Sequence, residues 1–142
     1  MKQNRILVAG GAGFIGSHLC QTLLNKGHFI ICLDNLVTGD KKNIQTLLDN
    51  PKFQFIKGDT RTFSFDEEVD EIYDLASPAS VTYVSEHPVE AATSNSIGTK
   101  NLLDLAHVKG AAFLFASSSE AYGDPKVHPQ PETYWGNVNP VG

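Results

Sequence analysis

The sequence predicts a doubly wound α/β domain, with a parallel sheet in the strand order 3-2-1-4-5 and helices on both of its faces. Short apolar segments alternate with longer helical ones, the turns between them are short, and the first apolar segment stops at a group of glycines. A chain of 142 residues is long enough for one domain with a hydrophobic core and too short for two ordinary ones.

Five short apolar segments are the expected strands. They lie at residues 5–9, 29–33, 53–56, 71–75 and 112–116. The first is uniformly apolar, which is typical of a strand that is buried on both faces of a parallel sheet. The alternation of these strands with helices predicts right-handed crossovers between parallel neighbours.

Two segments carry the periodic apolar residues of helices. The first covers residues 13–26 and ends before Gly27, which stands where a C-terminal glycine belongs. Pro88 fits the first turn of a second, longer helix that ends near Gly110. Residues 38–50 suit a loop with a short polar helix.

Composition and charge exclude several classes of function. The chain has 11 Lys and Arg residues against 16 Asp and Glu, so binding to a nucleic-acid backbone is not expected. The longest apolar run, residues 111–116, is far shorter than the roughly 20 residues of a membrane-spanning helix, and the N-terminus lacks a signal-peptide core. A cytoplasmic location is therefore expected. Cys20, Cys32 and the histidines lack metal-ligand spacing, so no metal site is expected.

The turn after the first expected strand carries the glycine pattern Gly11-x-Gly13-x-x-Gly16, preceded by Gly10. Glycines at these places permit a tight turn and allow a pyrophosphate to approach the backbone N–H groups at the start of the helix. The pattern alone is weakly specific, but it lies between a strand and a helix, as a Rossmann-type dinucleotide-binding fingerprint requires. A plain strand-to-helix turn is the alternative.

Asp34 follows the second expected strand, 18 residues after Gly16. A carboxylate at this position can accept hydrogen bonds from the ribose hydroxyls of an adenosine, and it repels a 2′-phosphate. The next residues are Asn35 and Leu36, and no arginine directly follows. The pattern therefore predicts NAD rather than NADP as the cofactor, with a loop-capping role for Asp34 as the alternative.

Other polar or small residues follow the later strands on the same edge of the sheet. Asp59 is placed to reach the adenine edge of a nucleotide or to act as an ordinary turn residue. Small residues at 75–77 leave room for a cofactor at the switch point of the sheet. The run 117–120, Ser-Ser-Ser-Glu, places hydroxyls and a carboxylate near the nicotinamide end, or is only a loop.

These residues together resemble the extended short-chain dehydrogenases/reductases that act on nucleotide sugars, a family of NAD-dependent epimerases and dehydratases. The resemblance runs from about Arg5 to the last residue. It is carried by Gly10-x-x-Gly13-x-x-Gly16, Asp34-Asn35, Asp59, Ala76, Asn95 and Ser118-x-Glu120-Ala121-Tyr122-Gly123. A narrower similarity, to family members that decarboxylate UDP-glucuronate, rests on residues 32–39, residues 75–80 and, as the most specific segment, residues 123–140.

The resemblance implies a set of NAD contacts. The start of the first helix would meet the pyrophosphate, the end of the second strand and its loop would hold the adenosine, and the end of the third strand would meet the adenine. The end of the fourth strand and one asparagine would shape the pocket behind the ribose and nicotinamide. In that order the implied residues are Gly10, Gly13, Phe14, Ile15 and Gly16; Asp34, Asn35, Thr38 and Gly39; Asp59 and Thr60; and Leu75, Ala76, Ser77 and Asn95.

The resemblance also implies three catalytic positions. Ser118 matches the family's Ser or Thr that hydrogen-bonds the sugar oxygen undergoing oxidation. Ser119 stands where related 4,6-dehydratases carry an acidic Asp, and a serine cannot serve as that acid at neutral pH. Glu120 matches a glutamate shared by dehydratases and decarboxylases. The expected reaction of the full-length protein converts UDP-glucuronate to UDP-xylose: NAD⁺ takes a hydride from C4, the 4-keto acid loses CO₂, and NADH returns the hydride.

Parts of the family pattern are not found in these 142 residues. The family's Tyr-x-x-x-Lys is expected a few residues after Gly142, and neither Tyr122 nor Tyr134 is expected to replace it. The family's substrate domain is likewise not expected within these residues. We therefore expect residues 1–142 to be an incomplete NAD-binding domain that binds NAD without turnover, and the full-length protein to be a homodimer.

Several alternatives stay open. One alternative is that the full-length protein is a nucleotide-sugar 4-epimerase or a 4,6-dehydratase. Another is that the chain is a non-catalytic dinucleotide-binding module.

Thr93 stands near a position where the family usually has a lysine, which weakens the expectation of an anionic substrate in the usual pose. The last expected strand, residues 112–116, has no sixth neighbour, so self-association through that edge is expected.

Overall fold

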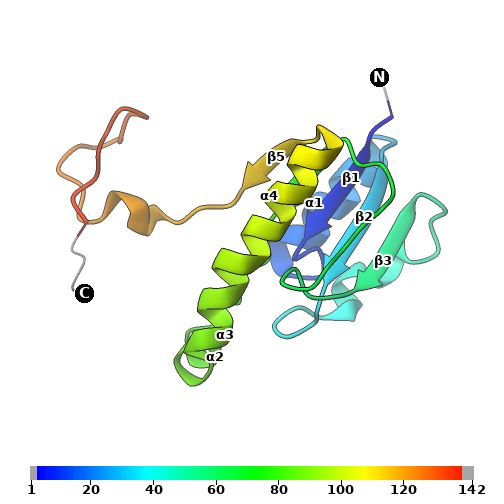
Figure 1. The fold of residues 1–142 in the computed structure, drawn as a ribbon, viewed down its shortest axis with the longest axis horizontal. Coiled ribbons are helices and arrows are strands. Elements are labelled where there is room, and N and C mark those ends of the chain that lie inside the picture. The colour runs from blue at the N-terminus through cyan, green and yellow to red at the C-terminus, as the bar shows by residue number, and fades with distance from the viewer. Residues whose placement is uncertain (1–2, 139–142) are drawn as a thin grey trace.

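The computed structural model describes residues 3–138, and it contains a five-stranded parallel sheet in the order β3-β2-β1-β4-β5 (Figure 1). The predicted fold class and strand order are confirmed. The strands are β1 (Arg5–Ala9), β2 (Phe29–Asp34), β3 (Phe53–Lys57), β4 (Glu71–Asp74) and β5 (Ala112–Phe115). β4 and β5 end one residue before the predicted limits, although the N–H groups of Leu75 and Ala116 still donate to carbonyl oxygens of the neighbouring strands.

Helical segments connect the strands. They are α1 (Phe14–Asn25), the 3₁₀ helix η1 (Lys41–Leu47), α2 (Val81–Glu86), α3 (Pro88–Thr93), the π-helical turn η2 (Ser94–Gly98), α4 (Thr99–Lys109) and the 3₁₀ helix η3 (Ser119–Tyr122). The predicted long helix is present as α3, η2 and α4 in direct succession, and Gly110 ends it with a left-handed φ of 65°. The apolar pattern does not predict α2, because none of its residues is buried.

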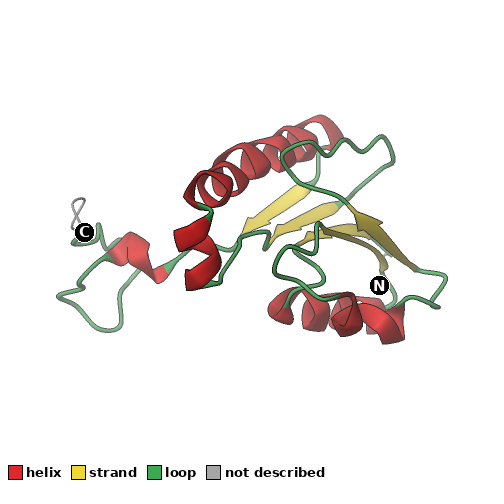
Figure 2. Cartoon of the chain, turned by 90° about the horizontal axis from the view of Figure 1, so that it is seen from below, coloured by secondary structure: helices red, strands yellow, loops and turns green. Residues whose placement is uncertain are grey.

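Two helical layers cover the sheet, with α1 on one face and the α3–α4 segment on the other (Figure 2). Successive side chains of a strand point to opposite faces. Ile6 and Val8 of β1 therefore pack into the core on the α1 side, whereas Leu7 and Ala9 pack into the core on the α4 side. Burial on both faces explains why the first strand is uniformly apolar.

β5 lies at one edge of the sheet and, within the described residues, pairs only with β4. The chain after β5 leads away from the sheet through η3 (Figure 1) and folds back at a bridge between Gly123 and Asn137. The last two residues of the segment 123–140, which carries the narrower similarity, lie outside the described residues, as do residues 141 and 142. Between residues 3 and 138, no helix combines the length and apolarity that a membrane crossing requires.

Candidate functional site

The glycine turn packs between the ends of β2 and β4. Gly10 has a left-handed φ of 75° and donates its N–H to the carbonyl oxygen of Leu33 at 2.8 Å. A Cβ atom on Gly10 would lie 2.6 Å from the carbonyl oxygen of Leu75, and one on Gly16 would lie 2.1 Å from the carbonyl oxygen of Gly10. Only glycine fits at these two positions, so α1 begins in direct contact with the turn.

α1 begins without a side-chain cap. Its N-cap residue, Gly13, has an extended backbone and makes no side-chain hydrogen bond, so no side chain satisfies the first N–H groups of the helix. The side chains of Phe14 and Ile15 are exposed. Uncapped N–H groups at the positive end of a helix dipole attract an anion, which is what the predicted pyrophosphate position requires.

Asp34 reaches back to the glycine turn. Its Oδ2 atom accepts from the N–H of Ala12 at 2.9 Å, and its Oδ1 atom accepts from the N–H of Leu36 at 2.8 Å. The residue is only 8% exposed. Each carboxylate oxygen keeps a second lone pair, so the group can still accept hydrogen bonds from two hydroxyls of a ribose.

Two cavities lie beside the glycine turn. The first, called here the Asp34 cavity, has a volume of about 90 Å³ and lies at the ends of β2 and β3. The second, the Ser118 cavity, has a volume of about 770 Å³ and extends past the end of β4 to β5. The residues that line both are Gly10, Gly13, Thr38, Leu75, Ala76 and Ser77. The two cavities are therefore adjacent parts of one site along the carboxyl edge of the sheet.

All the predicted cofactor residues except Asp59 line one cavity or both. Of these predicted residues, the ones that line only the Asp34 cavity are Asp34, Asn35, Gly39 and Thr60. The predicted cofactor residues that line only the Ser118 cavity are Phe14, Ile15, Gly16 and Asn95. The sequence prediction thus selects residues from both halves of the site.

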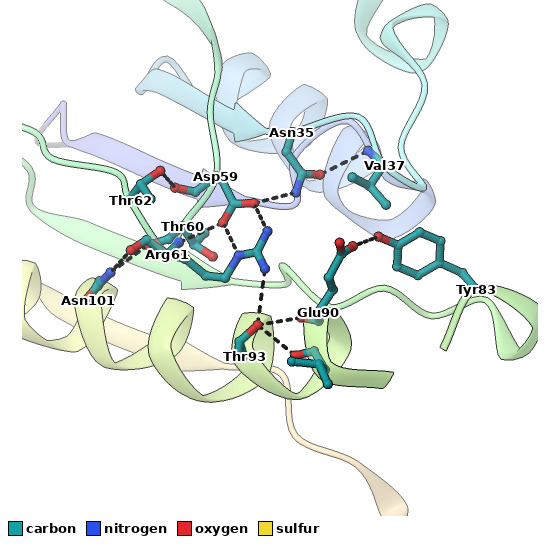
Figure 3. Close-up of polar contacts among 11 residues, drawn as sticks. Asn35, Val37, Asp59, Thr60, Arg61, Thr62, Tyr83, Glu90, Thr93 and Asn101 are labelled. Atoms are coloured by element: carbon teal, nitrogen blue, oxygen red, sulfur yellow. Dashed lines mark hydrogen bonds and ion pairs between the residues drawn. The ribbon is translucent and has the colours of Figure 1, made fainter. Parts of the chain in front are cut away.

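Asp59 is held instead by a network of polar side chains (Figure 3). Its Oδ1 atom accepts from Nε of Arg61 at 2.9 Å, and its Oδ2 atom accepts from Nη2 of Arg61 at 2.7 Å and from Nδ2 of Asn35 at 3.2 Å. The hydrogen bonds from Arg61 hold the pKa of Asp59 well below its usual value. Nη1 of Arg61 donates in turn to Oγ1 of Thr93 at 3.2 Å, so the network joins the loop after β3 to α3.

The Asp34 cavity also contains residues that the sequence did not single out. Arg61 and Ser94 line it, as do Tyr83 of α2 and Glu90 of α3. The Tyr83 hydroxyl donates to Oε2 of Glu90 at 2.5 Å, a bond that raises the pKa of Tyr83 and holds α2 against α3 (Figure 3). Ser80 caps α2 by accepting from the N–H of Tyr83, and a serine at that position is the sequence signal that could have indicated this helix.

The π-helical turn η2 supplies residues to both cavities. Ser94 lines the Asp34 cavity, and the next residue, Asn95, lines the Ser118 cavity. π turns inside α-helices are rare and recur at functional sites. The sequence predicts one uninterrupted helix here, and that prediction is wrong. The π turn interrupts the helix at the point where its residues line the two halves of the site.

Among the three predicted catalytic residues, Ser118 alone lines a cavity. Its hydroxyl accepts from the N–H of Glu120 at 3.2 Å and so caps η3. Ser119 and Glu120 lie on η3, where both are exposed and outside the lining of either cavity. The structure brings one of the three predicted residues to the site.

Tyr122 does carry a lysine four residues later, Lys126, so spacing alone does not exclude it from the family's Tyr-x-x-x-Lys pair. That spacing brings two side chains together only within a helix. η3 ends at Tyr122, Gly123 has a left-handed φ of 63°, and Pro125 follows, so no helix joins the two residues. Tyr122 and Lys126 also line neither cavity, and this geometry, rather than the spacing, leaves Tyr122 out of the catalytic set.

The described residues contain no group of three or more His, Cys, Asp or Glu side chains that could hold a metal ion. Cys20 and Cys32 are fully buried in the core on the α1 side. A hydrogen bond with Cys20 raises the pKa of the Cys32 thiol, so the thiol stays protonated. Both cysteines act here as packing groups.

Fold and site together define the class of this protein. A doubly wound sheet with a glycine turn before α1, a carboxylate at the end of β2 and cavities along the switch point is the arrangement of a dinucleotide-binding domain. The residues fit such a group, because the turn admits no side chain at Gly10 and Gly16 and Asp34 keeps lone pairs for a ribose.

Comparison with known proteins gives the family. The sequence model of the NAD dependent epimerase/dehydratase family matches residues 6–141, and the chain belongs to that family. The chain is 50% identical over 141 residues to UDP-glucuronic acid decarboxylase 1 of Arabidopsis thaliana, a match that covers 99% of this chain and 32% of that protein. The chain thus spans about a third of the length of this relative.

Solved structures agree with this placement. The UDP-Glc/GlcNAc 4-epimerase of Campylobacter jejuni has a TM-score of 0.83 at 33% identity, covering 98% of this chain and 45% of that one. The UDP-glucose 4-epimerase of Brucella ovis in complex with NAD has a TM-score of 0.76 at 28% identity, covering 96% of this chain and 42% of that one. The family resemblance and NAD as its cofactor, both predicted from the sequence, are confirmed.

Proposed function

We propose that this chain binds NAD across the carboxyl edge of its sheet. The Asp34 cavity takes the adenosine, the start of α1 takes the pyrophosphate, and the Ser118 cavity takes the nicotinamide half. The observation that carries the proposal is the Asp34 carboxylate, which lines its cavity beside the glycine turn and has lone pairs left for ribose hydroxyls. A 2′-phosphate would meet this negative charge, so NAD is favoured over NADP.

For the whole protein we propose the decarboxylation of UDP-glucuronate to UDP-xylose. The support is the 50% identity to a UDP-glucuronic acid decarboxylase. Bound NAD would supply the acceptor for a hydride from C4 of the sugar. Ser118 lines the Ser118 cavity and would hydrogen-bond the C4 oxygen there. A ketone at C4 lies β to the carboxylate, so the C–C bond to CO₂ breaks readily.

For the 142-residue chain by itself we propose NAD binding without turnover. Tyr122 and Lys126 are not joined by a helix, and Ser119 and Glu120 lie outside both cavities. Ser119 and Glu120 are therefore proposed as catalytic residues only of the whole protein, with a substrate that reaches along η3. We likewise propose that the whole protein is a homodimer.

A 4-epimerase is the second candidate function, because the similar solved structures named above are 4-epimerases with TM-scores of 0.83 and 0.76. Sequence identity favours the decarboxylase, because the chain is 50% identical to the decarboxylase but only 33% and 28% identical to the two 4-epimerases. The products of the two activities differ by one carbon atom, C6 of the sugar. Mass spectrometry of the UDP-sugar product made by the whole protein from UDP-glucuronate should show loss of CO₂, and a product that retains C6 would favour the epimerase.

The cofactor proposal is tested by calorimetric titration of the 142-residue chain with NAD⁺ and with NADP⁺. We expect binding of NAD⁺ and clearly weaker binding of NADP⁺. Asp34→Asn should weaken NAD⁺ binding by about tenfold or more, because hydrogen bonds to a charged acceptor are the stronger kind. Asp49→Asn, an exposed carboxylate outside the site, serves as the control. Absence of affinity for either nucleotide would remove the proposal, and preference for NADP⁺ would contradict it.

A further inference from the structure

Arg61 carries the only positive charge among the described residues that line the two cavities. It lines the Asp34 cavity together with the carboxylate of Asp34, which is the end of the site where the proposed adenosine ribose lies. An arginine near that ribose is the usual means by which a dinucleotide site accepts a 2′-phosphate, because its guanidinium makes paired hydrogen bonds to phosphate oxygens. The location of Arg61 therefore opposes the selectivity expected from Asp34.

The guanidinium of Arg61 is already occupied by another anion. Nε and Nη2 donate to the two oxygens of Asp59 at 2.9 and 2.7 Å, which is the paired geometry that a phosphate would otherwise take. The third nitrogen, Nη1, donates to Thr93 at 3.2 Å. The Asp59 side chain is 23% exposed and that of Arg61 30% exposed, so solvent only partly screens the pair.

Asp59 is itself fixed in this position. Its Oδ2 atom accepts from Asn35 at 3.2 Å, and its Oδ1 atom accepts from the backbone N–H of Arg61 at 2.9 Å. These two bonds hold the carboxylate against the guanidinium and outside the lining of the cavity.

We propose that Asp59 determines cofactor specificity by neutralising Arg61, so that selection of NAD over NADP depends on two carboxylates. Asp34 repels the 2′-phosphate, and Asp59 removes the cation that would attract it. This inference rests on the proposed NAD site, and it assigns to Asp59 a role different from the adenine contact predicted from the sequence.

The test is calorimetric titration of the 142-residue chain and its variants with NAD⁺ and with NADP⁺. Asp59→Asn removes the negative charge and frees Arg61, so the ratio of the NADP⁺ to the NAD⁺ dissociation constant should fall by about tenfold relative to the unmodified chain. The gain in NADP⁺ affinity should shrink as the salt concentration rises, because it depends on charge. The double variant Asp59→Asn with Arg61→Gln should return the ratio to that of the unmodified chain.

The outcomes separate the inference from the function on which it rests. An unchanged ratio in a folded Asp59→Asn protein that still binds NAD⁺ overturns the inference alone. A ratio that falls equally in the double variant overturns it too, because loss of the Asp59 charge would then act without Arg61. If the unmodified chain binds no NAD⁺, the proposed NAD site and the inference about Asp59 both fail.

A second variant covers the case in which Asp59→Asn does not fold. Arg61→Lys keeps the positive charge but cannot make the paired hydrogen bonds of a guanidinium, so the cation is held less tightly by Asp59. The dissociation-constant ratio should then move in the same direction by a smaller factor. An unchanged ratio in this variant overturns the inference.

Discussion

Single residues shape the site at the glycine turn and at the Asp59–Arg61 pair. A substitution at the turn has a steric cost, and one at the pair changes the local charge. Gly10 and Gly16 let the first helix touch the turn that precedes it, and Asp34 ties the same turn to the end of β2. Asp59 and Arg61 form a second, separate cluster that faces α3. Predictions at this scale therefore concern steric fit in the turn and charge in the cluster.

Gly16→Ala should both destabilise the fold and weaken NAD⁺ binding. The new Cβ would lie 2.1 Å from the carbonyl oxygen of Gly10, so the turn and α1 must move apart. Overpacking of this kind costs about 1–3 kcal/mol in the free energy of unfolding. Thermal unfolding and calorimetric titration measure the two effects. Thr22→Ala, at an exposed position of the same helix, should change neither, and equal behaviour of the two variants would contradict the steric account.

The ion pair of Asp59 and Arg61 should stabilise the fold at neutral pH and lose its effect in acid. The pKa of Asp59 is depressed in the folded chain, below an unfolded value of about 3.9. The contribution is therefore fully present above about pH 4 and is lost only as the pH falls toward the lower, folded pKa. NMR titration of the Asp59 carboxyl carbon should show no inflection near pH 4. Arg61→Gln should bring that inflection back up, and an ordinary titration of Asp59 in the unmodified chain would contradict the pairing.

Individual elements owe their position to which of their faces is buried. α4 presents Leu102 and Ala106 to the sheet, whereas Leu103 on the same helix is 46% exposed. α2 buries no residue, and it is held by its serine cap and by the bond between Tyr83 and Glu90. The π turn between α3 and α4 places neighbouring residues in different halves of the site.

Two leucines of α4 give a matched test of this burial. Leu102 is 1% exposed in the core between α4 and the sheet, so Leu102→Ala should cost about 2–5 kcal/mol in the free energy of unfolding. Leu103→Ala makes the same chemical change at a position that is 46% exposed and should cost less than about 1 kcal/mol. Urea unfolding of both variants measures the difference. Similar losses would mean that α4 does not pack on the sheet through Leu102.

At the scale of the whole molecule, the sheet has one edge whose strand is poorly covered. β5 pairs only with β4 within residues 3–138, and Leu114 and Phe115 are 49% and 51% exposed. An edge strand with unpaired backbone groups and apolar side chains is prone to pair with another chain. The Asp34 cavity lies at the ends of β2 and β3, away from this edge, whereas the Ser118 cavity extends to Phe115 of β5.

The 142-residue chain should therefore self-associate through β5 as its concentration rises. Leu114→Lys places a charge on that edge and should reduce the association, because charged edges resist pairing. Val108→Lys is the control, since Val108 is 77% exposed and belongs to α4 rather than to the edge strand. Light scattering over a concentration series measures the mass. A monomer at high concentration, or an equal effect of both substitutions, would refute this prediction.

Much of the fold was predictable because its signals are local. The five apolar segments, the glycine pattern and Pro88 are each read from a few neighbouring residues, and all correspond to elements of the structure. α2 was not predictable from apolar periodicity, since it buries nothing. The spacing of Tyr122 and Lys126 predicts no contact by itself, because a four-residue spacing brings two side chains together only in a helix and η3 ends at Tyr122.

By itself, the sequence determined the order of the sheet, the glycine turn before α1 and the carboxylate at the end of β2, because these depend on the types and spacing of residues near one another in the chain. Tertiary structure alone decided that Asp59 accepts from Asn35, 24 residues earlier in the chain, and that Arg61 reaches Thr93, 32 residues further on. It also decided that Ser118 enters a cavity while Ser119 and Glu120 do not. Contacts between distant segments arise only when the helices pack on the sheet, and residue spacing carries no record of them.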